Sequence, residues 1–218
     1  MEKNKLKYRS VFVVFLIIIF GSWNLACAHQ PRLVGDSLEI KIPDPEISRA
    51  YYGELNGRFV KYEIEKQEPF ILYVNLLVPK VKDIGKDISA KIYKDGSEIA
   101  FLNGINFEWK EFYEPFGGDY YYEGPEFKES VAPGKYTVEI SSRDNLGKYV
   151  VAIGEKEEFP LKEIVKTLTA LPYLKINFFE KSVWEVIFGR VGLIFAVFLV
   201  LLAGIFLLAK KIRRVVLK

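Results

Sequence analysis

The chain has 218 residues, half of them apolar and 15% aromatic, which suffices for one ordinary domain with additions and excludes a disordered protein. A single Cys excludes a disulfide framework within one chain, and a single His excludes any site that needs two imidazoles. Charge is unevenly distributed: residues 1–28 hold four basic and one acidic side chain, residues 190–218 hold six basic and no acidic ones, and the segment between them holds 21 basic and 27 acidic. An acidic domain therefore lies between two basic ends.

Residues 1–28 have the features of a secretory signal peptide. Four basic residues precede an unbroken apolar run of ten, Val11 to Phe20, and the small residues Ala26-Cys27-Ala28 follow as a cleavage site. We expect cleavage after Ala28, which would leave His29 at a solvated N-terminus. Two alternatives remain open: an uncleaved signal anchor, and lipidation of Cys27, because Leu25-Ala26-Cys27 is similar to the end of a bacterial lipobox.

Residues 36–157 carry strand signals throughout. Apolar and polar side chains alternate over 38–42 and 59–65, as in strands with one solvated face. The run 70–78 is apolar except for Asn75, which predicts a central strand covered on both faces. Asp95-Gly96 predicts a hairpin, because a type I′ turn needs positive φ at both central residues.

The segments 135–140 and 148–153 both begin with Lys-Tyr directly after a Gly. We expect these two strands to pair as one antiparallel hairpin. About seven or eight short strands separated by regular turns predict a mainly β protein, with an antiparallel β-sandwich over residues 29–158.

Five motifs in this domain carry a resemblance to a known family: Tyr62-Glu63-Ile64-Glu65, Phe70-Ile71-Leu72-Tyr73-Val74, Ile92-Tyr93-Lys94-Asp95-Gly96, Ala132-Pro133-Gly134-Lys135-Tyr136-Thr137-Val138 and Gly147-Lys148-Tyr149-Val150. They resemble the pre-peptidase C-terminal domains, small secreted β-sandwiches attached to prokaryotic enzymes and surface proteins. The whole layout also resembles uncharacterised prokaryotic single-pass membrane-anchored proteins that share the segment 114–119. The resemblance covers about 50–155 and implies a fold rather than an activity. The long insert at 103–130 departs from the family, which has a short polar loop there.

Residues 159–189 are predicted to form a short helical stalk after the sandwich. Leu161, Ile164, Val165 and Leu168 recur at helical spacing, Pro160 precedes them and Pro172 limits the helix. The stalk would pack on the sandwich, lie among the lipid headgroups or simply close the domain.

Residues 190–209 are predicted to form one transmembrane helix. Val191 to Ala209 has no charged side chain over nineteen residues, a helix of about 28 Å. The basic tail 210–218 follows at once, so the positive-inside rule places it in the cytoplasm and the sandwich outside. We expect a single-pass protein of the cytoplasmic membrane that contacts lipid through 190–209 and binds no nucleic acid, because a basic tail at a membrane exit acts as a stop-transfer signal.

The segment 107–129 is the strongest candidate for function because it combines aromatic rings with carboxylates. Such rings and carboxylates can contact sugars or proteins, although aromatic residues in a β domain are also ordinary core. We expect a non-enzymatic binding or assembly module with a protein or glycan partner outside the cell. The residues expected to make that contact are Trp109, Tyr113, Phe116, Asp119, Tyr121 and Glu123.

Two other functions fit the same residues. A carboxylate-based hydrolase acting on envelope glycans would need two acids facing each other about 5–9.5 Å apart across a cleft. An accessory subunit of a membrane complex would dock through the stalk. No cofactor is expected; Ca²⁺ is the weaker alternative, since it needs six to eight converging oxygens.

Overall fold

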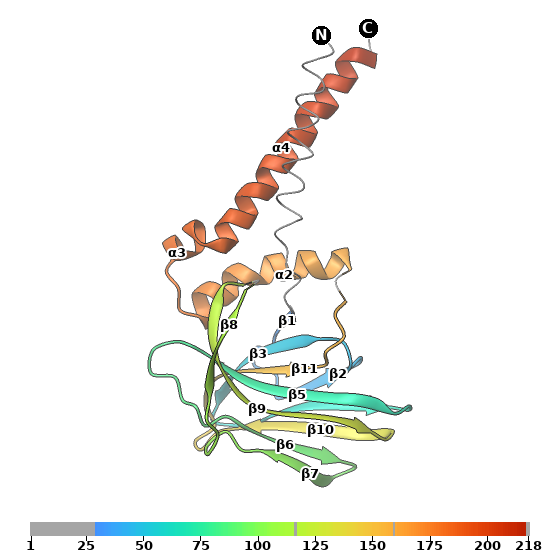
Figure 1. Ribbon diagram of the computed structural model, residues 1–218, viewed down its shortest axis with the longest axis vertical. Coiled ribbons are helices and arrows are strands. Elements are labelled where there is room, and N and C mark those ends of the chain that lie inside the picture. The colour runs from blue at the N-terminus through green and yellow to red at the C-terminus, as the bar shows by residue number, and fades with distance from the viewer. Residues whose placement is uncertain (1–28, 116, 159, 217–218) are drawn as a thin grey trace.

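Two β-sheets packed face to face form the body of the protein in this computed structural model, which describes residues 29–115, 117–158 and 160–216. The expected signal peptide, with Cys27, lies outside the described residues. Eleven strands make up the two sheets of the described chain, and helices follow them (Figure 1). The expectation of a mainly β protein with a β-sandwich is confirmed.

The two sheets have different sizes. The six-stranded sheet has the order β1 (Gln30–Leu33), β3 (Arg49–Asn56), β11 (Leu146–Ile153), β5 (Phe70–Pro79), β9 (Asp119–Val131) and β8 (Lys110–Glu114). The five-stranded sheet has the order β2 (Glu39–Ile42), β4 (Val60–Lys66), β10 (Gly134–Ser141), β6 (Ser89–Lys94) and β7 (Ser97–Leu102).

Both sheets are mixed, so the expectation of a purely antiparallel sandwich is wrong in part. β1 pairs with β3 in parallel, and β2 pairs with β4 in parallel. The chain alternates between the sheets from β1 to β5, so each strand and the next but one lie in the same sheet. The chain leaves one sheet, forms a strand in the other and returns, so the two strands of each edge pair run in the same direction.

The core lies between the inner faces of the two sheets. Tyr62 on β4 and Tyr149 on β11 are fully buried, and their hydroxyl groups are hydrogen-bonded at 2.9 Å across the sandwich. The Tyr149 ring lies over Gly53, where an added Cβ would stand 2.5 Å from the ring. The missing side chain of Gly53 thus lets the Tyr149 ring pack closely, although a Gly inside a strand usually weakens it.

One expected hairpin is present and the other is not. β6 and β7 form the first, with Asp95 at φ 48° and Gly96 at φ 85°. β10 and β11 do not pair with each other: β10 lies between β4 and β6, and β11 between β3 and β5. Their apolar side chains face one core from opposite sheets, and a linear pattern does not distinguish this arrangement from a hairpin.

The expected insert at 103–130 is mostly sheet rather than loop. β9 pairs with β5 from Phe70–Val131 to Pro79–Tyr121, and β8 adds an edge strand. The register shifts between Asn75 and Leu77, where β9 has an extra residue. This β-bulge interrupts the alternation of side chains, which is why the period-2 pattern of a strand was not visible in the sequence.

The helical part begins on the outer side of the six-stranded sheet. α2 (Leu161–Tyr173) lies across this side and runs directly into a wide helical turn, η1 (Leu174–Phe178), so Pro172 does not end the helix. α3 (Val183–Phe188) and α4 (Arg190–Val216) follow, and α4 leads away from the sandwich beyond α2 (Figure 1). Within the described residues, no helix has the combined length and hydropathy of a membrane span. The C-terminal transmembrane helix therefore stays a prediction.

Candidate functional site

A cavity of about 110 Å³ lies between the outer face of the six-stranded sheet and the cover formed by α2 and η1. We call it the covered cavity. Its lining includes Ala50 on β3 and Val150 on β11, both buried. Small side chains on these inner strands leave room beneath the helices that larger ones would fill.

Two buried polar side chains, Thr167 and Asn75, line the covered cavity. Thr167 on α2 is 4% exposed, and its Oγ1 has no hydrogen bond within the described chain. Asn75 on β5 is 3% exposed, and its residue is part of the same lining. Native proteins leave few such groups unpaired, because each forgone hydrogen bond costs about 1–3 kcal/mol.

The β-bulge orients two carboxylates to the same side of β9. Glu123 and Glu126 both project from the outer face, although an odd spacing in a regular strand would send them to opposite faces. Tyr73 donates a hydrogen bond to Glu126 at 3.3 Å. Burial raises the pKa of Glu123, the nearby Glu126 raises it further, and Lys110 opposes the shift. Glu123 and Tyr73 both line the covered cavity.

His29 lies at the covered cavity rather than at a solvated end of the chain. Its Nδ1 is hydrogen-bonded to the Ser48 hydroxyl, and its ring lines the cavity. Burial lowers the pKa of His29, and Glu157 opposes the shift. The expectation of a solvated His29 is wrong, because β1 adds to the edge of the sheet and brings its first residues under α2.

The low pKa of His29 gives a testable dependence of stability on pH. Unfolded His29 takes up a proton near its ordinary pKa of 6.5, whereas the folded residue does so only at lower pH. The contribution of His29 is therefore fully present above pH 6.5 and is lost as the pH falls below it. Urea unfolding of a His29→Gln variant between about pH 7 and 5 should show a weaker loss of stability than wild type. Parallel curves for the two proteins would contradict this.

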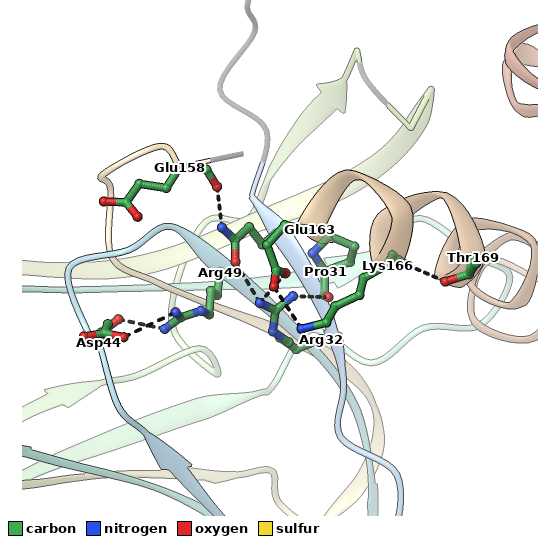
Figure 2. Close-up of polar contacts among 9 residues, drawn as sticks. Pro31, Arg32, Asp44, Arg49, Glu158, Glu163, Lys166 and Thr169 are labelled. Atoms are coloured by element: carbon green, nitrogen blue, oxygen red, sulfur yellow. Dashed lines mark hydrogen bonds and ion pairs between the residues drawn. The ribbon is translucent and has the colours of Figure 1, made fainter. Parts of the chain in front are cut away.

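One end of α2 is fixed to β1 by an ion pair. Arg32 contacts the Glu163 carboxylate at 2.7 Å, and Lys166 contacts the same group at 2.9 Å (Figure 2). The hydrogen bond from Lys166 lowers the pKa of Glu163, and Arg32 lowers it further against the effect of burial. The Arg32–Glu163 pair holds the cover over the cavity at its β1 side, and Lys166 on α2 supports the Glu163 carboxylate.

The other end of the cover is fixed to the turn between β8 and β9. Asp119 is 3% exposed and accepts hydrogen bonds from the side chains of Lys175 and Lys181, the second at 2.5 Å. Lys175 also donates to the carbonyl oxygen of Gly117, and Lys181 to that of Gly118 at 3.2 Å. Burial lowers the pKa of Lys175, and Asp119 opposes this shift. The turn is thereby joined to η1 and the segment after it.

A further contact joins the same turn to the first residue of α4. The Arg190 guanidinium donates to the Pro115 carbonyl oxygen at 2.5 Å and lies 5.5 Å from the centre of the Tyr113 ring. Guanidinium groups over aromatic faces are stabilised by the ring quadrupole. The β8–β9 turn therefore contacts the helical segment at three basic residues.

The six residues expected from the sequence to share a contact surface are dispersed. Asp119, Tyr121 and Glu123 line the covered cavity. Trp109 packs on the inner core instead, and the Tyr113 ring lies tilted against that of Tyr120, with ring centroids 4.8 Å apart. Phe116 lies outside the described residues.

Sequence reasoning missed Asn75 and Thr167 as candidate site residues. A signal existed for the first, since Asn75 is the one polar residue in the apolar run 70–78. Thr167 has no comparable signal, because its burial depends on how α2 lies on the sheet. The described part of the chain contains no group of three or more acidic, His or Cys side chains placed to hold a metal ion.

Comparison with family models and with curated proteins found no match to the chain. Among solved structures, the chain is similar to the pre-peptidase C-terminal domain of a collagenase from Bacillus anthracis, with 13% identity, a TM-score of 0.35, and coverage of 54% of this chain and 94% of that one. That domain belongs to the family that the sequence motifs resemble.

Two β-glucosidases are also similar over part of their length. The enzyme from Kluyveromyces marxianus has 18% identity and a TM-score of 0.26, with coverage of 51% of this chain and 12% of that one. The enzyme from Paenibacillus barengoltzii has 7% identity and a TM-score of 0.27, with coverage of 58% and 13%. The chain thus spans about an eighth of either β-glucosidase. Likenesses this distant say nothing of activity, and the fold assignment rests on the strand topology.

Proposed function

We propose that this chain is a non-enzymatic binding or assembly module of the cytoplasmic membrane, with the β-sandwich outside and residues 190–209 as its single anchor. The observation that carries this proposal is the exposed apolar surface of α2 and α3. α2 lies across the outer side of the sandwich, and α4 runs away from the sandwich on that side (Figure 1). The tail 210–218 would then lie in the cytoplasm, and a protein or glycan partner would be met outside.

The exposed apolar residues are unfavourable in water and suited to a membrane interface. Leu161 and Val165 are one helical turn apart on α2 and exposed, while the basic Lys162 and Lys166 flank them. On α3, Trp184 and Phe188 are 69% and 81% exposed, and their rings stack with centroids 6.0 Å apart. Trp is enriched where lipid meets water because its ring is apolar and its N–H is polar.

The charge distribution supports the same orientation. The nineteen residues from Val191 to Ala209 carry no charge, and five basic residues lie between Lys210 and Lys218. Inserting one Lys or Arg at the centre of such a segment would cost about 2.5–3.5 kcal/mol. Cations grouped after the segment, with an acidic domain before it, favour a cytoplasmic tail.

Cysteine labelling tests this orientation. In a Cys27→Ser background, a membrane-impermeant maleimide should label Ser97→Cys, at an exposed position of β7, in intact spheroplasts. The matched Lys218→Cys variant should be labelled only after permeabilisation. Both should stay in the membrane pellet after alkaline carbonate. The opposite labelling pattern would show that the orientation is inverted. Release by carbonate would show that residues 190–209 do not anchor the protein.

A hydrolase acting on envelope glycans is the second candidate. Glu114 and Glu123 line the same cavity, and a carboxyl group with a raised pKa can serve as a general acid. We expect the full-length protein to release no reducing ends from purified envelope glycan. Release that disappears in a Glu123→Gln variant would establish the hydrolase instead.

Docking to a larger membrane complex is a variant of the leading proposal. The stacked Trp184 and Phe188 would then face a protein rather than lipid. A photocrosslinker at position 184 in native membranes distinguishes these surroundings, since it reacts either with lipid or with one protein of defined mass.

A further inference from the structure

We propose that the covered cavity binds one small, uncharged, hydroxyl-rich molecule, of the size of a glycerol unit or a single sugar ring. This inference deepens the proposed binding role, since it places a ligand of that module beneath α2. It does not depend on the membrane orientation. The cavity lies between two parts of the chain joined by ion pairs at both ends, so the geometry points to a formed site rather than a surface depression.

The unpaired Thr167 hydroxyl and the buried Asn75 amide give the first argument. They come from a sheet strand and from the covering helix, so the cavity presents hydrogen-bonding groups on opposite walls. An amide and a hydroxyl each offer both a donor and an acceptor. A ligand hydroxyl likewise donates and accepts, and it can satisfy either group. Filling the cavity with such a molecule removes the cost of leaving the Thr167 hydroxyl unpaired.

The balance of charge around the cavity gives the second argument. Three carboxylates line it, on Glu114, Asp119 and Glu123. Asp119 already has two ammonium partners, Lys175 and Lys181. Glu114 accepts the Gly117 N–H at 2.5 Å and attracts Lys175. Burial and the nearby Glu126 raise the pKa of Glu123 against the effect of Lys110, which favours its uncharged form. Among the described residues, no Lys or Arg lines the cavity to hold an anion, and no three acidic, His or Cys side chains lie together to hold a metal cation, so the site favours an uncharged molecule.

The apolar part of the lining suits a sugar-sized ring. Phe112 on β8, Tyr121 on β9 and Phe179 after η1 line the covered cavity beside its polar groups. The Tyr121 and Phe179 rings meet edge to face, with centroids 5.2 Å apart. Small-molecule sites combine apolar and aromatic walls with a few placed polar groups, which is the composition found here.

Ligand-observed NMR on the full-length protein tests the proposal. The protein is held in a detergent without a sugar headgroup, and saturation transfer is titrated with glucose and with glycerol. Wild type should give a saturable signal for at least one of these probes. Thr167→Val keeps the shape of the side chain and removes its hydroxyl, and Asn75→Leu removes the amide. Each should weaken binding at least tenfold.

The matched control is Thr169→Val, on the same helix but exposed and hydrogen-bonded to the Lys166 carbonyl oxygen. It should bind as wild type does. The thermal midpoint of Thr167→Val should equal or exceed that of wild type, since the lost hydroxyl had no partner. A folded variant that no longer binds therefore reports on the site itself.

Three results would overturn the proposal. The first is that neither probe saturates wild type, and the second is that both bind Thr167→Val and Asn75→Leu as tightly as wild type. Saturable binding of ethylammonium or acetate alone would show that the charge argument is wrong. The labelling experiment above is unaffected by any of these, so failure of the ligand site and failure of the anchor are distinguishable.

Discussion

Replacing Asp119 with Ala is expected to lower the free energy of unfolding by about 3–5 kcal/mol. Asp119 is the shared partner of Lys175 and Lys181, and Lys175 is itself almost wholly buried. Without the carboxylate, a buried ammonium group would lose its closest opposite charge and keep the hydrogen bond to the Gly117 carbonyl oxygen. Removing one member of a buried pair costs more than the pair contributes, because the remaining charge has been taken out of water.

Urea unfolding of the full-length protein, followed by circular dichroism, measures this effect. The informative control is the double variant Asp119→Leu and Lys175→Met, which removes the buried charge together with its partner. It should recover most of the lost stability, since apolar side chains of similar volume often replace a buried ion pair without loss. A loss below about 1 kcal/mol for Asp119→Ala would show that the network is solvated.

Replacing Trp109 with Ala is expected to cost about 3 kcal/mol of folding stability. The sequence suggested Trp109 as a contact for an external partner, but its ring packs against the inner core. Its Nε1 donates to the Gly104 carbonyl oxygen at 2.8 Å. The ring also lies against Gly124, where an added Cβ would stand 2.6 Å from it. Truncation would leave both a cavity and an unpaired carbonyl oxygen.

The matched control for Trp109 is Trp184, the exposed tryptophan of α3. Trp184→Ala should leave unfolding in detergent within about 0.5 kcal/mol of wild type, because an exposed side chain forms little of the core. The same circular dichroism measurement serves both variants. If the two variants had equal free energies of unfolding, the Trp109 ring would not be part of the core, and it would again be a candidate contact residue.

The β-bulge in β9 explains why the site was only partly visible in the sequence. The pattern of aromatic and acidic residues at 107–129 drew attention to this segment, and three of the six expected residues line the covered cavity. The bulge places Glu123 and Glu126 on one face, whereas a regular strand would separate them. Asp119 was expected at a surface, but two lysines 56 and 62 residues further along the chain bury and neutralise it.

Local pattern by itself was enough for the mainly β class, for the strands whose side chains alternate, and for the Asp95-Gly96 hairpin. These features depend on neighbours within a few residues, so the order of side chains along the chain predicts them directly. Pairing was decided only in three dimensions: β10 and β11 separate into different sheets, and β1 joins β3 in parallel. The covered cavity was likewise beyond any local pattern. Its lining comes from strands and a helix that approach one another only when the core is buried, and burial acts on the whole chain at once.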